Sequence, residues 1–453
     1  MSIASIVILC LLVMYISYGC LFNRLSSCRR NLLFVTILTS LFLKIGKAIY
    51  LGFYIDHSML FGISFIFLTL VMLYLKKIKL SVNRKMLFFC IAYFVVVFIG
   101  EFFLLVDSSG MPKILSDRTP DAYVMGLSST WVTPAFSIQN VKEIVFNIYF
   151  FFIIFLSMDL LKEKIFMYSL VIYIKRGFYV YFVLFLLEML SNIYFGETVF
   201  REIVMYLLWG DADDSVASIM ERFGVLIPMV FFHETSFVCV CIILLLLYYV
   251  NKFDSQLDVI MFFVMLFVLI SSMSTMGWGL ILFWLVVYVK NYQSKYKKIY
   301  LLITLSYMAL GVIYCIENLD VVTAGIDFAQ VKLETYLGID KVSVNMSGEA
   351  RGLSNKIAMD EIKYSPIWGI GLGSMYSFGM IPSFFSNVGI LGAFLFCYVV
   401  GLSINCKISR SNFVPFIIMM FYLTSIFNGH MYIYQPMGLT LFLPYSQSIF
   451  YKK

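Results

Sequence analysis

Residues 86–99 read MLFFCIAYFVVVFI, an apolar run that no charged residue interrupts. Runs of the same kind occupy residues 2–21 and 239–250. A helix of a soluble protein keeps a polar face toward water, whereas a helix that is apolar on every side contacts lipid or protein all round. With their apolar neighbours, these runs reach the roughly 20 residues that a helical membrane crossing requires. We therefore predict that they are transmembrane helices.

The composition extends this prediction to the whole chain. Of its 453 residues, 62% are hydrophobic and 13% are charged, whereas soluble proteins carry about 25% charged residues. No polar stretch is long enough to form a large soluble domain. We predict a single all-α polytopic transmembrane domain over residues 1–453, with about 12–14 helices. The expected helix cores are 3–22, 32–54, 58–75, 86–106, 140–161, 177–194, 230–250, 257–272, 276–290, 299–316, 384–404, 413–428 and 437–450.

Lysine and arginine residues are concentrated in alternate loops, which predicts the sidedness of the chain. Segments on the predicted inner side hold 21 of the 33 Lys and Arg residues, and the segments between them hold 19 of the 26 Asp and Glu residues. Basic loops lie on the cytoplasmic side, so the net charge of +7 does not indicate a nucleic-acid partner. We expect a retained first helix with its N-terminus outside. The basic segments are 23–31, 76–85, 162–176, 251–256, 290–298, 405–411 and 451–453.

Three loops on the predicted outer side are long: residues 107–139, 191–230 and 317–385. Long loops on a membrane scaffold often carry function. Within the largest loop, SNKIAMDEIKY at 354–364 predicts a helix with Ser354 as its N-cap. Pro366 then ends that helix, and WGIGLGS follows, whose alternating glycines permit a tight turn or a close backbone approach.

Charged residues near or inside the spans are the first candidates for function, because charge is costly in a membrane. His233 and Glu234 interrupt an apolar run near its outer end, and Lys44 and Lys47 share a helix face in the second span. The structural alternatives are an ion pair of the two lysines with Glu101 or Glu188, and an interfacial or hydrogen-bonding role for Glu234. Arg222 and Arg351 stand in outer loops. A lone loop arginine is usually a solvated charge, but arginine can also neutralise a diphosphate without a metal.

Three segments together resemble the bacterial O-antigen polymerase and ligase superfamily. They are ERFGVLIPMVFFHETSFVC at 221–239, SSMSTM at 271–276, and the stretch 349–400 with its WGIGLGS and SNVGILG runs. That family carries an Arg upstream of a Glu-x-Ser helix start, and then an Arg, a helix and a Pro-x-x-Gly-x-Gly run in a large periplasmic loop. The positions that match are Arg222, Glu234, Ser236, Arg351, Pro366, Gly369, Gly371 and Gly373.

The resemblance implies a GT-C-like helical membrane glycosyltransferase of the bacterial inner membrane, with its active face in the periplasm. The implied reaction joins undecaprenyl-diphosphate-linked oligosaccharide repeat units, with a polysaccharide chain-length regulator as a further partner. We expect no metal and no cofactor. The expected catalytic residues are Arg351, Arg222, Glu234 and His233, and the expected substrate-binding residues are Lys44, Lys47, Arg201, Gly371 and Gly373.

Other functions fit some of the same features. A ligase of this superfamily usually carries a His shortly before the re-entry helix, and residues 317–385 contain none, which favours a polymerase. A lipid-linked oligosaccharide flippase would more often have short loops and internal repeats. A small-molecule transporter would leave the arginines of the outer loops unexplained, and a non-enzymatic scaffold would leave the charges inside the membrane unexplained.

Overall fold

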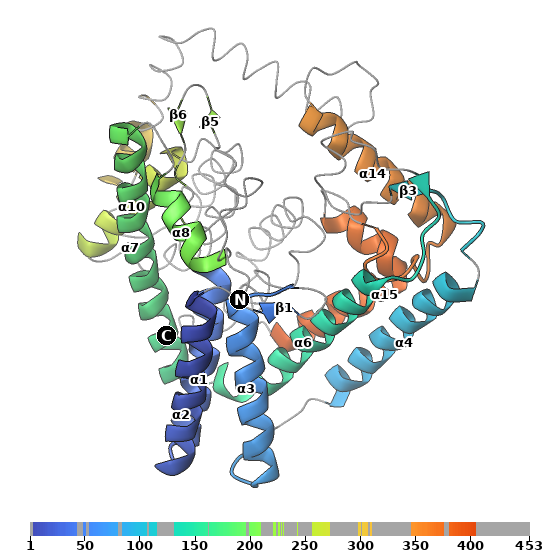
Figure 1. Cartoon of the computed structure of the whole chain (residues 1–453), viewed down its shortest axis with the longest axis horizontal. Coiled ribbons are helices and arrows are strands. Elements are labelled where there is room, and N and C mark those ends of the chain that lie inside the picture. Colours follow the sequence, from blue (N-terminus) through green and yellow to red (C-terminus); the bar gives the residue numbers. More distant parts are fainter. Residues whose placement is uncertain are drawn as a thin grey trace.

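The computed structural model shows a mostly helical protein (Figure 1). Within the part of the chain that the structure describes, five helices are long and apolar enough to cross a membrane: His57–Tyr74, Arg84–Val106, Ile138–Leu161, Tyr168–Phe195 and Pro382–Val399. Two shorter apolar helices cover Ser5–Leu21 and Val259–Leu269. The structure describes residues 3–42, 49–50, 54–79, 84–106, 108–115, 131–161, 163–195, 199–209, 221–222, 225–226, 228, 230, 242, 256–271, 298–299, 301–306, 309, 346–375 and 380–404.

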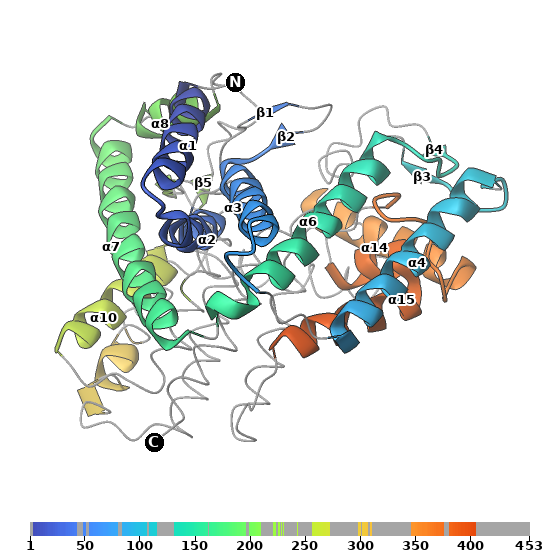
Figure 2. The same ribbon diagram turned by 90° about the horizontal axis from the view of Figure 1, so that it is seen from below.

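The helices form two groups with α6 (Ile138–Leu161) between them (Figures 1 and 2). On one side, α2 packs on α1, α3 and α7, and α3 also contacts α6. On the other side, α15 packs on α4, α14 and α6. The helices of the first group are α1 (Ile3–Leu21), α2 (Leu25–Phe42), α3 (His57–Tyr74), α7 (Lys164–Phe195), α8 (Val199–Trp209) and α10 (Gln256–Ser271); those of the second are α4 (Arg84–Val106), α14 (Met346–Tyr364) and α15 (Met380–Ile404).

Helix α4 shows why these helices belong in lipid. Its buried stripe includes Cys90, Tyr93, Val97 and Leu104. The opposite stripe is exposed and equally apolar: Phe88, Ile91, Val95, Phe98, Phe102 and Leu105. Water would require a polar outer face, whereas lipid accepts an apolar one.

Aromatic side chains fill the core where α4, α6 and α15 meet. The ring of Tyr93 lies 5.4 Å from Phe151 and 5.7 Å from Phe396, centroid to centroid, spacings typical of favourable ring pairs. The Tyr93 hydroxyl donates to Oδ1 of Asn147 at 2.9 Å, so these two buried polar side chains are paired with each other. These three packed helices form the surface that α14 contacts, through α15 and through Leu104 of α4.

Three short antiparallel hairpins were not predicted. They are β1–β2 (Ile49–Tyr50 with Tyr54–Ile55), β3–β4 (Ile114–Leu115 with Trp131–Val132) and β5–β6 (Glu221–Arg222 with Val225–Leu226). The first hairpin corrects the expected second span, because residues 49–50 and 54–55 form paired strands and the helix does not continue to residue 54. After it, Asp56 caps α3 by accepting the Met59 N–H at 2.7 Å, as N-cap aspartates do.

Two predicted inner loops are helical instead. Within 23–31, helix α2 already begins at Leu25, and within 162–176, helix α7 begins at Lys164 and continues to Phe195. The basic residues were taken to mark loops, but a buried ion pair described below neutralises Arg29 inside α2. In the predicted loop 191–230, α7 extends to Phe195 and α8 follows. The expected cores 413–428 and 437–450 lie outside the described residues.

Candidate functional site

Helix α14 and the glycine loop after it form the centre of the candidate site. The helix begins at Met346 and ends at Tyr364, so the end before Pro366 is confirmed. The predicted start is wrong, because Ser354 lies inside the helix and is buried. No cap is needed there, since the preceding residues continue the helical turn.

The loop between α14 and α15, residues 365–375, is bonded to the first turns of α15. The Ile370 N–H donates to the Ser386 carbonyl at 2.9 Å, and the Gly371 N–H donates to the Asn387 carbonyl at 3.1 Å. The Asn387 side chain completes the attachment, because its Oδ1 accepts the Met375 N–H at 3.1 Å and its Nδ2 donates to the Met375 carbonyl at 2.7 Å. Helix α15 breaks nearby at Gly389, whose φ is 66°.

Two buried polar side chains bind the same loop from α4 and α6. Glu101 on α4 accepts the Leu372 N–H at 2.6 Å through Oε1 and the Asn140 amide at 3.3 Å through Oε2. Asn140 on α6 also donates to the Leu372 carbonyl at 3.0 Å and to the Ser374 hydroxyl at 2.8 Å. A buried carboxylate is tolerated when it accepts several hydrogen bonds. The loop is therefore held by three membrane helices at once.

Gly371 and Gly373 are the two loop glycines that were expected to contact substrate. Both have positive φ, +97° and +83° respectively, in the region that favours glycine. A Cβ on Gly373 would lie 2.9 Å from the backbone oxygen of Gln139, and a Cβ on Gly371 would lie 3.0 Å from Oε2 of Glu101. These contacts explain the glycines by the close approach of the loop to α4 and α6, and their contact with substrate stays a prediction.

Arg351 lies in the first half of α14, three residues before Ser354. Ser354 begins a face of the helix that continues through Ile357 and Ala358 to Glu361, at the i+3, i+4 and i+7 positions. Ser354, Ile357, Ala358 and Glu361 are all buried. Ile357 and Ala358 pack with Leu104, Met111, Ile114, Ile370 and Met375 in a small apolar cluster.

Glu361 is the residue of this region that the sequence did not single out. Its side chain is fully buried, and neither carboxyl oxygen has a hydrogen-bond partner among the residues that the structure describes. Burial, with a smaller contribution from the charge of Asp360, raises the pKa of Glu361 to about 8. Natural proteins rarely leave a buried carboxyl unpaired. Glu361, which lies in α14 beside the glycine loop, is therefore a functional candidate.

Two buried charged side chains lie on α7 and α8 and interact electrostatically. Glu188 on α7 accepts the Val230 N–H at 2.5 Å, and Arg201 on α8 is 2% exposed. Desolvation lowers the pKa of Arg201, and the negative charge of Glu188 opposes this shift. Arg201 was expected to bind substrate; the structure places it beside a carboxylate, and its substrate role stays a prediction.

The remaining predicted residues are described only in part. Arg222 lies in strand β5, which pairs with β6 in a hairpin. Lys44, Lys47, His233 and Glu234 lie outside the described residues, so their catalytic and substrate-binding roles stay predictions. No group of three or more His, Cys, Asp or Glu residues with metal-binding geometry occurs in the described part of the chain.

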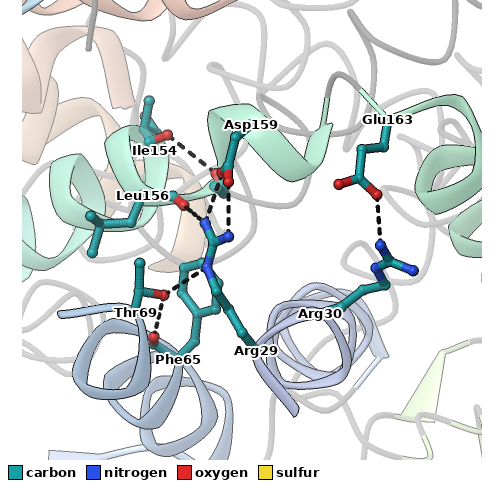
Figure 3. A network of polar contacts seen from close by, with 9 residues as sticks. Arg29, Arg30, Phe65, Thr69, Ile154, Leu156, Asp159 and Glu163 are labelled. Carbon is teal, nitrogen blue, oxygen red and sulfur yellow. Dashed lines mark hydrogen bonds and ion pairs between the residues drawn. The ribbon is translucent and has the colours of Figure 1, made fainter. Parts of the chain in front are cut away.

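A separate polar network lies at the other end of α6 (Figure 3). Arg29 on α2 donates from Nη1 and Nη2 to the two carboxylate oxygens of Asp159 at 2.8 and 2.7 Å. It also donates to the Thr69 hydroxyl at 3.1 Å and to the Leu156 carbonyl at 2.6 Å. All three guanidinium nitrogens are thus paired, as a buried arginine requires, and we interpret this network as structural.

Comparison with known proteins adds no family assignment. No protein-family model matches the chain, no curated protein is significantly similar in sequence, and no solved structure is significantly similar in fold.

Proposed function

We propose that the chain is an O-antigen polymerase, which joins undecaprenyl-diphosphate-linked oligosaccharide repeat units on the periplasmic face of the bacterial inner membrane. The observation that carries the proposal is the attachment of α14, the helix of Arg351, to the membrane helices. Glu101, Asn140 and Asn387 bind the loop that follows this helix. An arginine that must contact a lipid-linked diphosphate needs a rigid support at the membrane surface.

The proposed reaction is a glycosyl transfer. A hydroxyl oxygen of the acceptor unit attacks the anomeric carbon of the growing chain, forming the new glycosidic bond. The bond from that carbon to the diphosphate oxygen breaks, and undecaprenyl diphosphate leaves with the electron pair. In this proposal Arg351 and Arg222 stabilise the charge on the leaving diphosphate. Glu234, with His233 beside it in sequence, accepts the proton of the attacking hydroxyl.

Analysis of surface polysaccharide on a gel tests the proposal in a strain that lacks the gene. Lipid cores capped with a single repeat unit, and a ladder restored by the wild-type gene, are the expected results. Polymer that accumulates on its lipid carrier without reaching the core would indicate a ligase. Loss of all capping without such polymer would indicate a flippase, and an unchanged ladder would contradict the whole proposal.

Complementation with Arg351→Ala tests the arginine. The ladder should be lost while the protein level in the membrane stays normal, because removal of a diphosphate ligand costs transition-state stabilisation, on the order of a hundredfold or more in rate. Lys356→Ala is the matched control, since Lys356 is an exposed cation on the same helix. Wild-type chain lengths in the Arg351→Ala strain would remove this residue from the mechanism.

A further inference from the structure

A cavity of about 750 Å³ lies between α1, α2, α3 and α7, away from the candidate site. Its walls are mostly apolar and include Leu12, Val35, Leu38 and Phe166. A cavity of this volume is large enough for a ligand of several hundred daltons. Two of the four wall helices, α3 and α7, contain candidate membrane spans, and α1 is a shorter apolar helix, so the nearest apolar ligand is lipid.

One end of the cavity is polar, and it is the end near the Arg29–Asp159 network. Tyr15, Arg30 and Asn31 line this end, and Asn31 Nδ2 donates to the Tyr15 hydroxyl at 2.7 Å. Along its length, the cavity is lined by residues of α2 between Arg30 and Leu38 and by residues of α7 between Ile165 and Tyr173. Eight residues of helix span about 12 Å, which approaches half of a hydrocarbon core about 30 Å thick. The cavity therefore has the depth of one leaflet.

Arg30 differs from its neighbour Arg29 in having donors to spare. Only its Nη2 is used, in an ion pair with Glu163 at 2.9 Å (Figure 3). Nε and Nη1 of Arg30 have no hydrogen-bond partner among the residues that the structure describes, and its side chain is 48% exposed. A guanidinium with free donors at the rim of an apolar cavity is suited to a phosphate oxygen.

We propose that this cavity binds one anionic phospholipid of the inner leaflet, with an acyl chain between α1, α2 and α7 and its phosphate at Arg30. The polyprenyl carrier is a poorer fit, because its diphosphate would lie at the opposite end of the membrane helices in the proposed reaction. The assignment to the inner leaflet rests on the predicted sidedness, and the exclusion of the polyprenyl carrier rests on the proposed function, while the binding of a lipid in this cavity depends on neither. Bound lipid would fill the space between α1, α2 and α7, and would thereby support their packing.

Native mass spectrometry of the full-length protein, purified in mild detergent and mixed with phosphatidylglycerol or phosphatidylethanolamine, tests the site. Wild-type protein should retain one phosphatidylglycerol. Val35→Trp should reduce its occupancy about tenfold, because the indole takes the volume of the acyl chain. Val13→Trp is the control, since Val13 is exposed on α1 and does not line the cavity. Equal losses in both variants, retention of detergent only, or retention of polyprenyl phosphate would overturn the proposal.

Arg30→Gln tests the headgroup contact separately. The preference for phosphatidylglycerol over phosphatidylethanolamine should fall about fivefold, the factor that corresponds to roughly 1 kcal/mol for one interfacial charge. Arg84→Gln is the control, because Arg84 is an exposed arginine at the start of α4. An unchanged preference in Arg30→Gln would overturn the assignment of the headgroup.

A measurement on wild-type protein guards against misfolded variants. Phosphatidylglycerol with a photoreactive diazirine in one acyl chain should crosslink to residues 8–15, 31–38 and 165–173 in the membrane. Crosslinks spread evenly over the exposed stripe of α4 would show ordinary lipid contact and would contradict the site. Neither result depends on polysaccharide synthesis, so failure of the lipid site and failure of the polymerase proposal are distinguishable.

Discussion

Arg29 and Arg30 are consecutive residues that pair with Asp159 and Glu163, yet their surroundings differ. The side chains of Arg29 and Asp159 are 4% and 30% exposed, whereas those of Arg30 and Glu163 are 48% and 43% exposed. Breaking a buried pair leaves an uncompensated charge and costs about 3 kcal/mol or more, while an exposed pair contributes under about 1 kcal/mol. The two neighbouring ion pairs should therefore contribute very differently to stability.

We predict that Arg29→Ala lowers the free energy of unfolding by about 3 kcal/mol, and that Arg30→Ala lowers it by less than about 1 kcal/mol. Titration of the purified protein with sodium dodecyl sulfate in mixed micelles measures both. The double variant Arg29→Ala/Asp159→Ala should recover part of the loss, because the orphaned carboxylate is removed. Equal effects of the two arginines would show that burial does not decide the strength of these pairs.

Glu361 predicts a dependence of stability on pH. Its pKa is about 8 in the folded protein, against an ordinary value of 4.5, so between these values the folded state holds a proton that the unfolded state has lost. Stability should therefore fall as pH rises from about 5 to 8, by on the order of a few kcal/mol, and should level off above pH 8. Melting temperatures in detergent, followed by tryptophan fluorescence, measure this slope.

Two variants separate the causes of that slope. Glu361→Gln keeps the shape of the side chain and removes its titration, so the fall in melting temperature between pH 5 and 8 should shrink. Asp360→Asn should retain most of the slope, because burial is the larger cause of the pKa shift and the charge of Asp360 is the smaller. A slope that survives Glu361→Gln unchanged would have to come from another group.

Among the elements, the loop between α14 and α15 connects the candidate site to the membrane helices. We predict that Gly373→Ala weakens this connection, because the residue has a φ of +83° and its new Cβ would lie 2.9 Å from the Gln139 carbonyl oxygen. The left-handed backbone alone costs roughly 1–2 kcal/mol. A lower melting temperature and a shorter polysaccharide ladder are expected. Gly110→Ala is the control, because its backbone is not left-handed and the nearest atom to its new Cβ would be the Tyr364 hydroxyl at 3.2 Å, the far end of a side chain that can shift, so it should leave both unchanged.

The sequence predicted long apolar elements well and their polar interruptions poorly. Helix α4 follows from its apolar run, because lipid accepts apolar residues on every face. The hairpin at 49–55 was missed, since its sequence IYLGFYI is as apolar as a span and hydropathy does not separate short strands from helix. Arg29 was assigned to a loop because an unpaired arginine is costly inside a membrane helix. Its partner, Asp159, lies 130 residues away along the chain, so the sequence does not show that the charge is neutralised.

The candidate site was predictable only where a motif marked it. The glycine run and Pro366 indicated the turn after α14, and the structure confirms that turn. Glu101 was considered as a partner for Lys44 and Lys47; the structure shows that it accepts a hydrogen bond from the backbone of Leu372, and the two lysines lie outside the described residues. Glu361 follows Asp360 in a polar stretch that resembles a solvated helix. Its burial depends on the packing of α14 against distant residues such as Leu104, which periodicity alone does not reveal.

At the scale of the whole molecule, α6 joins two polar regions with an apolar stretch between them. Near the first turn of α6, Asn140 binds the loop that follows α14. Near the last turn of α6, Asp159 binds Arg29. Nineteen residues of helix separate them, about 28 Å, close to the roughly 30 Å of a hydrocarbon core. The two polar networks therefore lie where the two surfaces of the membrane are expected.

This spacing makes the predicted sidedness testable. An epitope tag inserted after Ser109, between α4 and β3, should bind antibody on intact spheroplasts, because it lies at the α14 end of the molecule. The same tag after Lys77, between α3 and α4, should bind antibody only after the membrane is permeabilised, because basic connections stay in the cytoplasm. The reverse pattern would place Arg351 and α14 in the cytoplasm, where lipid-linked repeat units are not polymerised in the proposed reaction. That single result would exclude the polymerase proposal, while the lipid site at Arg30 would then belong to the outer leaflet.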